Sequence, residues 1–139
     1  MDSNKIHIET MIHKPIEKVW EAYTLPKHIM EWNHASEDWH SPKAENDLRP
    51  GGQFNYTMAA KDGSFSFDFS GIYDEVIVGK KISYTLGDNR KVDVYFSQQD
   101  GFVKVETLFE AEGTNSLDMQ KNGWQAILDN FKKYTESSL

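Results

Sequence analysis

The sequence contains no cysteine. This absence excludes disulfide bonds, thiolate catalysis and zinc sites built from cysteine ligands. Because chains without cysteine suit a reducing compartment, we expect a cytoplasmic protein.

Long apolar runs are also missing. No uninterrupted run of apolar residues is longer than three, whereas a membrane-spanning helix needs about 20 predominantly apolar residues. The apolar region of a secretory signal peptide needs about 7 to 15. The sequence therefore predicts neither a membrane span nor a signal peptide.

Positive charge is scarce and dispersed. The 15 lysines and arginines are outnumbered by 22 acidic residues, which gives a net charge of −7. The basic residues are scattered along the chain, but nucleic acids and anionic membranes select clustered positive charge. We therefore expect no nucleic-acid partner and no membrane insertion.

The chain is nonetheless rich enough in apolar residues to form a core. It has 139 residues, of which 38% are hydrophobic. This length corresponds to one domain, which we expect to span residues 1–139.

The last long segment of the sequence carries a single apolar stripe. Apolar residues recur at three- and four-residue steps over residues 117–134, which predicts an amphipathic helix. The stripe consists of Leu117, Trp124, Ile127, Leu128, Phe131 and Tyr134. Ser116, just ahead of it, can cap the first turn. Gly123 costs about 1 kcal/mol relative to alanine inside a helix, so we expect close packing or a bend there.

Much of the remaining chain alternates between apolar and polar residues, which is typical of half-buried strands. Short turns rich in glycine, asparagine and aspartate separate the strands, so the pattern predicts an antiparallel meander. Strands are expected at residues 5–12, 53–58, 65–76, 82–86, 92–96 and 103–109. Gly71 interrupts the third of these, and we expect a bulge or a bend at that position.

Two short helices and a long loop lie between the first two strands. Apolar residues on one face predict helices at residues 15–23 and 27–32. Residues 33–52 show no period and are rich in turn-forming residues, which predicts a loop with at most a short strand near residues 47–49. Because the helices lie before and after the meander, the predicted fold class is α+β.

This order of elements is similar to the helix-grip fold of the START-like and birch-pollen-allergen-like superfamily. Within that superfamily the sequence resembles the family named after the activator of the heat-shock-protein ATPase. The resemblance is carried by residues 15–23, Trp32, residues 47–54, Gly71, Asp74, Glu75, Gly123, Trp124 and Leu128. It implies a curved antiparallel sheet of about six strands wrapped round the C-terminal helix. One departure is Asn33, which stands where many relatives have a second tryptophan.

Aromatic residues on the expected inward faces converge on the space between helix and sheet. Two interpretations stay open: a cavity of roughly 300 to 1,000 Å³ for a small molecule, or an ordinary close-packed core. The periodicity alone favours the core, and the resemblance brings the two interpretations level. Of the two, we predict non-catalytic binding of a small hydrophobic or aromatic ligand, with Trp39 closing the mouth. The predicted ligand-binding residues are Trp32, Trp39, Phe54, Tyr56, Phe67, Phe69, Tyr84, Trp124 and Leu128.

Two other functions stay open. By analogy with the namesake of the family, the chain could be an interaction domain that contacts a chaperone through its outer surface. It could also be an enzyme of the cyclase or aromatase type, in which Tyr56 and Tyr84 supply acidic hydroxyls and His34 assists them. Tyr95 is the weakest candidate for such a role, because its place in the alternation turns it outward.

The loop at residues 33–52 also contains two histidines and two acidic residues. His34, Glu37, Asp38 and His40 are suited to zinc binding or to general-base catalysis. Their spacing matches no known metal motif, and no helix holds them in register. We therefore interpret them as polar loop residues and expect no metal, no cofactor and no catalytic residue.

Overall fold

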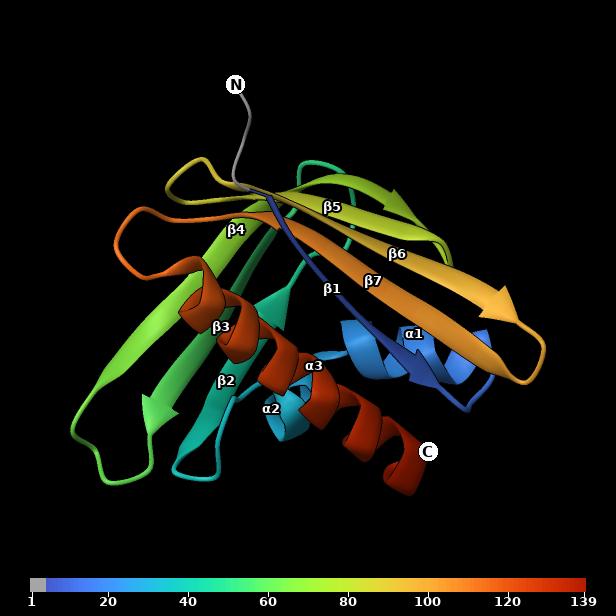
Figure 1. Cartoon of the computed structure of the whole chain (residues 1–139), viewed down its shortest axis with the longest axis horizontal. Helices are drawn as coiled ribbons and strands as arrows, with labels where there is room; N and C mark the ends of the chain where they lie inside the picture. The colour runs from blue at the N-terminus through green and yellow to red at the C-terminus, as the bar shows by residue number, and fades with distance from the viewer. Residues whose placement is uncertain (1–4) are drawn as a thin grey trace.

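The computed structural model describes residues 5–139, which form one curved antiparallel sheet and three helices (Figure 1). In chain order the elements are β1 (Lys5–Ile12), α1 (Ile16–Thr24), α2 (Pro26–Trp32), β2 (Trp39–Asn46), β3 (Gln53–Ala60), β4 (Ser66–Ile77), β5 (Lys81–Leu86), β6 (Lys91–Gln99), β7 (Phe102–Glu110) and α3 (Leu117–Ser138).

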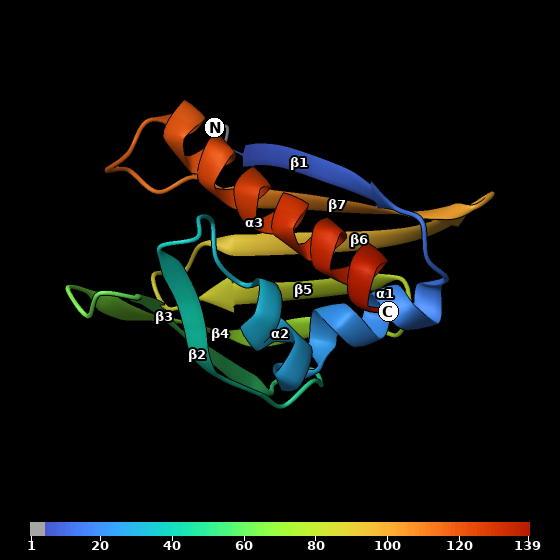
Figure 2. The same cartoon turned by 90° about the horizontal axis from the view of Figure 1, so that it is seen from below.

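The seven strands are ordered β1-β7-β6-β5-β4-β3-β2. Strands β3 to β7 form the predicted meander, β2 extends it at one edge, and β1 pairs with β7 at the other edge, so that Ile6 faces Phe109 across the ladder. The sheet curves around α3, while α1 and α2 lie together at one end of the concave side (Figure 2). This arrangement confirms the helix-grip fold expected from the resemblance.

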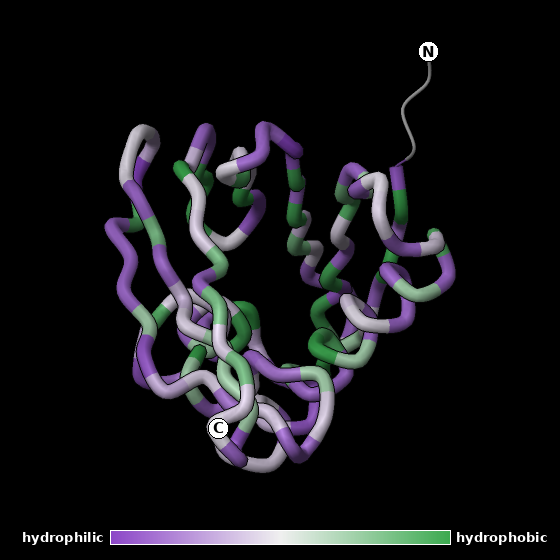
Figure 3. Tube along the Cα trace, turned by 90° about the vertical axis from the view of Figure 1, so that its left-hand side faces the viewer, coloured by the Kyte–Doolittle hydropathy of each residue, from purple (hydrophilic) through white to green (hydrophobic). Residues whose placement is uncertain are grey.

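The core follows from the alternation of residue types along the strands. Hydrophobic and hydrophilic segments alternate along the chain trace (Figure 3), and in β7 every second residue is buried. Val103, Val105 and Phe109 of this strand are completely buried. Because successive side chains of a strand point to opposite faces, one face of β7 contributes to the core and the other remains partly exposed.

The long C-terminal helix begins at Leu117, as the sequence predicts. It extends four residues beyond the predicted end, to Ser138 instead of Tyr134. Ser116 caps it, because its Oγ accepts a hydrogen bond from the backbone N–H of Met119 (3.1 Å). Most of the apolar stripe faces the sheet, and Phe131 is completely buried. Leu117, in the first turn, is an exception and is 51% exposed.

The prediction of a structureless loop at residues 33–52 is wrong in its middle part. Strand β2 lies there, at the edge of the sheet, whereas Arg49 lies in a turn outside any strand. The pairing of β2 with β3 shifts register between His40 and Lys43, next to Pro42. An edge strand interrupted by proline and a bulge shows no regular alternation, which explains why the sequence pattern did not reveal it.

The two glycines that the sequence singles out have different roles. The bulge expected at Gly71 lies instead between Tyr73 and Glu75, and pairing across Gly71 is regular. Gly71 is needed for close approach, because an added Cβ would lie 2.6 Å from the backbone oxygen of Thr85 and 2.9 Å from the Phe54 ring. Close packing at Gly123 is ruled out, since a Cβ there would meet nothing within 4 Å.

We predict that Gly71→Ala lowers the free energy of unfolding by about 1 to 3 kcal/mol, because the methyl group forces the Phe54 ring or the β5 backbone to move. The matched control is Gly123→Ala, which should raise stability by about 0.5 to 1 kcal/mol through its higher helix propensity. Urea denaturation followed by circular dichroism measures both changes. Equal effects of the two substitutions would contradict this account of Gly71.

Candidate functional site

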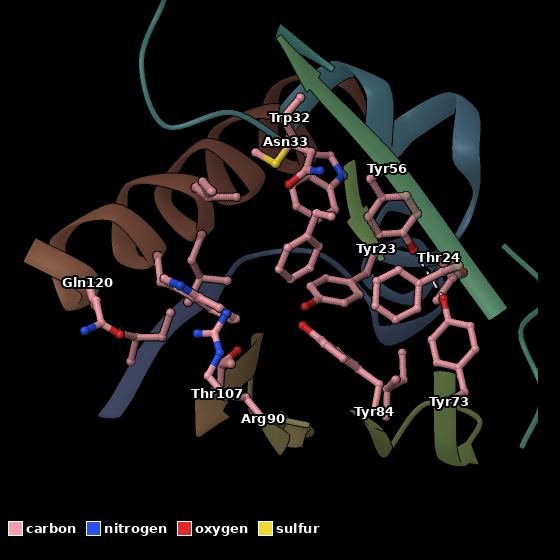
Figure 4. Close-up of a pocket in the computed structure, with 18 of the residues that line it drawn as sticks. Tyr23, Thr24, Trp32, Asn33, Tyr56, Tyr73, Tyr84, Arg90, Thr107 and Gln120 are labelled. Carbon is pink, nitrogen blue, oxygen red and sulfur yellow. Dashed lines mark hydrogen bonds between the residues drawn. The ribbon is translucent and has the colours of Figure 1, made fainter. Parts of the chain in front are cut away.

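A pocket of about 340 Å³ lies between α3 and the concave face of the sheet (Figure 4). Aromatic and aliphatic side chains make up most of its wall. They come from α1, α2 and α3 and from the inner faces of the strands, chiefly β3, β4 and β5. The volume lies near the lower end of the range of about 300 to 1,000 Å³ that is usual for small-molecule sites.

The position of α3 keeps this space open. Trp124 stacks on Phe109 of β7, with ring centroids 3.9 Å apart and ring planes 9° from parallel. The side-chain amide of Gln125 donates a hydrogen bond to the backbone oxygen of Glu9 in β1 (3.2 Å). These contacts hold the first half of α3 on the β1 side of the sheet (Figure 2), so the inner faces of β3 and β4 are left to line the pocket.

The second half of α3 closes one end of the pocket. Phe131 packs edge-on against Tyr23 of α1 (5.2 Å between centroids) and against Trp32 of α2 (4.9 Å). The Trp32 indole N–H donates to the backbone oxygen of Ala22 (2.8 Å), which fixes the corner between the two short helices. The helical end of the pocket is therefore a rigid aromatic wall.

The structure brings together eight of the nine predicted ligand-binding residues. Trp32, Phe54, Tyr56, Phe67, Phe69, Tyr84, Trp124 and Leu128 all line the pocket. Their role in binding stays a prediction.

Trp39, the ninth predicted residue, lies outside the pocket lining. Its ring packs next to Phe67 and Phe65, with centroids 6.0 and 6.1 Å away. We call these three residues the outer aromatic cluster. Phe67 belongs to both the cluster and the pocket wall and is 43% exposed, while Phe65 is 59% exposed. Trp39 is thus separated from the pocket by the ring of Phe67.

Several polar residues of the wall were missed from the sequence. Tyr23 was identified only as part of the apolar face of a short helix, yet it lines the pocket. Thr107 is a polar residue at an inward position of β7, between Val105 and Phe109, and this break in the apolar pattern was the available signal. Arg90 follows a turn and carried no comparable signal.

Tyr56 and Tyr73 belong to a hydrogen-bonded group at the wall. Their hydroxyl oxygens are 3.2 Å apart, and Asn46 Nδ2 donates to the Tyr73 oxygen (3.4 Å) and to the backbone oxygen of Thr24 (2.7 Å). Burial raises the pKa of both tyrosines, so they stay protonated. This group joins β2, β3 and β4 to the end of α1 and has a structural role.

Tyr23 and Tyr84 differ from that pair. Their hydroxyl groups point into the pocket (Figure 4), and neither makes a hydrogen bond to any residue in the described part of the chain. Burial raises the pKa of both, and the neighbouring hydroxyl of Tyr23 raises that of Tyr84 further. These groups are therefore neutral hydrogen-bond donors that the protein itself does not use.

Two charged residues, Arg90 and Glu112, line the pocket near the start of α3. Arg90 Nε donates to the carboxylate of Asp88 (2.7 Å). The Glu112 carboxylate accepts hydrogen bonds from the backbone N–H groups of Asn115 (2.6 Å) and Thr114 (2.8 Å), and these bonds lower its pKa. Both charges already have partners in the protein.

The polar loop residues do not form a metal centre in the structure. Asp38 accepts a hydrogen bond from the Ser36 hydroxyl (2.6 Å), and burial lowers the pKa of His34. Within residues 5–139, the one group of three potential ligands that approach one another is His7, Glu9 and Glu106, on the outer face of β1 and β7. Lys104 Nζ lies 3.6 Å from Glu9 and 3.7 Å from Glu106, so a cation already occupies this cluster.

The fold and the pocket together define a helix-grip protein of the kind that encloses an apolar site between one long helix and a curved sheet. The model of the family described as "Activator of Hsp90 ATPase homolog 1-like protein" matches residues 13–136. The chain belongs to this family, which supports a ligand-binding or activator-type domain.

Solved structures agree with this assignment. The chain is similar to the AHSA1-like protein from Aeromonas hydrophila, with 45% identity, a TM-score of 0.92, and coverage of 96% of this chain and 93% of that one. It is also similar to Chr148 from Cytophaga hutchinsonii, with 50% identity, a TM-score of 0.84 and the same coverage.

A more distant structure supports the fold alone. Protein NE0264 from Nitrosomonas europaea shares 16% identity at a TM-score of 0.82, over 99% of this chain and 97% of that one. No match was found among curated proteins. In the described range, no helix is both long and apolar enough to cross a membrane.

We predict that Tyr84→Phe lowers the free energy of unfolding by less than about 0.5 kcal/mol, because the lost hydroxyl has no partner in the protein. Tyr73→Phe is the control and should cost about 1 kcal/mol, since it breaks the hydrogen bonds to Tyr56 and Asn46. Urea unfolding of the two variants provides the comparison. A larger loss for Tyr84→Phe than for Tyr73→Phe would show that the Tyr84 hydroxyl is structural.

Proposed function

We propose that this protein binds a small hydrophobic or aromatic molecule between α3 and the sheet and does not transform it chemically. The observation that carries the proposal is the apolar pocket of about 340 Å³, with aromatic rings from both the sheet and the helices in its wall. A well-packed interior leaves few voids larger than a water molecule. A pocket of this size in so small a chain is therefore better explained by a ligand than by loose packing.

The chemistry of the wall favours binding over catalysis. Among its described residues there is no histidine, and the only ionisable groups besides the tyrosines are Arg90 and Glu112. Both of these are held in hydrogen bonds by other parts of the protein. His34, the base invoked for a cyclase-type enzyme, is not among the lining residues. The wall thus lacks a nucleophile paired with a base, which most reaction classes need.

A chaperone-associated function is the second candidate, and the outer aromatic cluster favours it. Three aromatic rings lie together, and two of them, Phe65 and Phe67, are 59% and 43% exposed. Exposed aromatic groups of this kind are common at protein interfaces. Capture of the chaperone by this protein, abolished by Phe65→Ser, would support this function; failure to capture it, with its ATPase rate unchanged, would count against it.

The ligand-binding proposal is tested by filling the pocket from its helical wall. Ile127 lines the pocket, and Ile127→Trp places an indole in the space that a ligand needs. We predict that this variant loses about tenfold or more in affinity for any ligand that the wild type binds. Calorimetric titration with a fatty acid, a sterol and a three-ring aromatic ketone covers the main ligand classes.

Asn122→Trp is the matched control, because Asn122 is exposed on the same helix and does not line the pocket. It should bind like the wild type. Saturable binding that survives Ile127→Trp would place the ligand elsewhere, and the absence of binding by any probe class would contradict the proposed function.

A further inference from the structure

Some polar groups of the pocket wall are paired within the protein and others are not; Asn33 Nδ2, for example, is buried without a partner. Tyr56, Tyr73, Glu112 and Gln120 are engaged in hydrogen bonds within the protein. The hydroxyl groups of Tyr23 and Tyr84 have no such bond to any described residue, although both residues lie in the wall. Both hydroxyl oxygens are accessible from the pocket space, so they are available to hydrogen-bond a molecule bound there.

Packing holds both unpaired hydroxyls in place. Tyr84 is only 8% exposed, and its ring lies edge-on to Phe54 (5.0 Å between centroids) and to Phe69 (6.5 Å). Tyr23 is clamped by Phe96 (5.4 Å) and Phe131 (5.2 Å), both in edge-on contacts. The two rings come from β5 and α1, and both hydroxyls point into the pocket (Figure 4). They therefore form a preorganised pair of donors.

From this geometry we propose that Tyr23 and Tyr84 bind the carbonyl oxygen of a neutral, mostly apolar ligand. This inference rests on the proposed function. A carbonyl oxygen has two lone pairs and can accept one hydrogen bond from each hydroxyl. The aromatic wall then encloses the carbon frame of the ligand, while the two phenols determine its orientation.

The surroundings favour a carbonyl oxygen over an anionic group. Burial raises the pKa of both tyrosines, so each keeps its proton and can donate it in a hydrogen bond. The one cation among the described wall residues is Arg90, whose charge is balanced by Asp88 at 2.7 Å. Glu112 adds a negative charge to the wall. A ligand with a full negative charge would have no unbalanced cation to meet.

Two rigid probes of nearly the same shape test the proposal: 9-fluorenone, which carries a carbonyl group, and fluorene, which lacks it. We predict that the wild type binds fluorenone about tenfold more tightly than fluorene, since fluorene leaves both donors unpaired. The carbonyl stretching band of bound fluorenone should shift to lower wavenumber than in an apolar solvent, because hydrogen bonding weakens the C=O bond.

Variants assign this effect to the two hydroxyls. Tyr23→Phe and Tyr84→Phe should each reduce the ratio of the two affinities, and the double variant should bring it close to one and reverse the infrared shift. Fluorene affinity should not fall, because the variants remove the donors that fluorene leaves unpaired, and this separates lost hydrogen bonds from lost packing. Tyr95→Phe is the control, because Tyr95 is exposed on the outer face of β6 and is not part of the wall.

The possible outcomes distinguish a failure of the tyrosine inference from a failure of the proposed function. Equal affinities for the two probes in the wild type, or an affinity ratio unchanged by the double variant, would overturn the role of the tyrosines and leave ligand binding intact. No binding of either probe would count against the proposed function and against the inference that rests on it.

Discussion

The stacking of Trp124 on Phe109 determines where α3 lies, and the pocket depends on that position. The two rings are nearly parallel, with centroids 3.9 Å apart, and they hold the first half of the helix over β7. The second half is anchored by Phe131 against the aromatic residues of α1 and α2. With both halves held at these points, the helix does not settle on β3 and β4, and the space above those strands becomes the pocket.

The pocket wall combines an apolar surface with a small number of polar groups. Hydrogen bonds within the protein occupy several of these polar groups, at Tyr56, Tyr73 and Glu112. In the interior, Tyr23 and Tyr84 remain as donors without a protein partner. An apolar wall that encloses a molecule, with a few fixed polar groups that orient it, is the usual composition of a small-molecule site.

Much of the fold could be predicted because its signals are local. The alternation of Phe65, Phe67 and Phe69 with small polar residues identifies one strand, and the apolar stripe from Trp124 to Phe131 identifies the buried face of α3. Strand β2 was missed because Pro42 and a bulge interrupt it at the sheet edge, where neither face is buried enough to impose alternation. The bulge lies between Tyr73 and Glu75 and not at Gly71, where glycine is needed for the close approach of the Phe54 ring.

The sequence could predict a pocket residue only where the side chain lies on the inward face of a regular helix or strand. Phe54, Phe69 and Trp124 follow from the period of their elements, and they do line the pocket. The free hydroxyl of Tyr23 was not predictable, because helical spacing shows which face a residue occupies and not whether its polar atom finds a partner. That outcome depends on residues distant in the sequence, such as Phe96 and Phe131, which clamp the ring.

The most direct test of an interior site is the set of intermolecular nuclear Overhauser effects between bound fluorenone and the isotope-labelled protein. This account predicts contacts from the ring protons of the probe to the Trp124 indole, the Phe54 ring and the Ile127 methyl groups, all of which line the pocket. Contacts confined to Trp39 and Phe65, outside the pocket, would contradict it and identify the outer surface as the binding site.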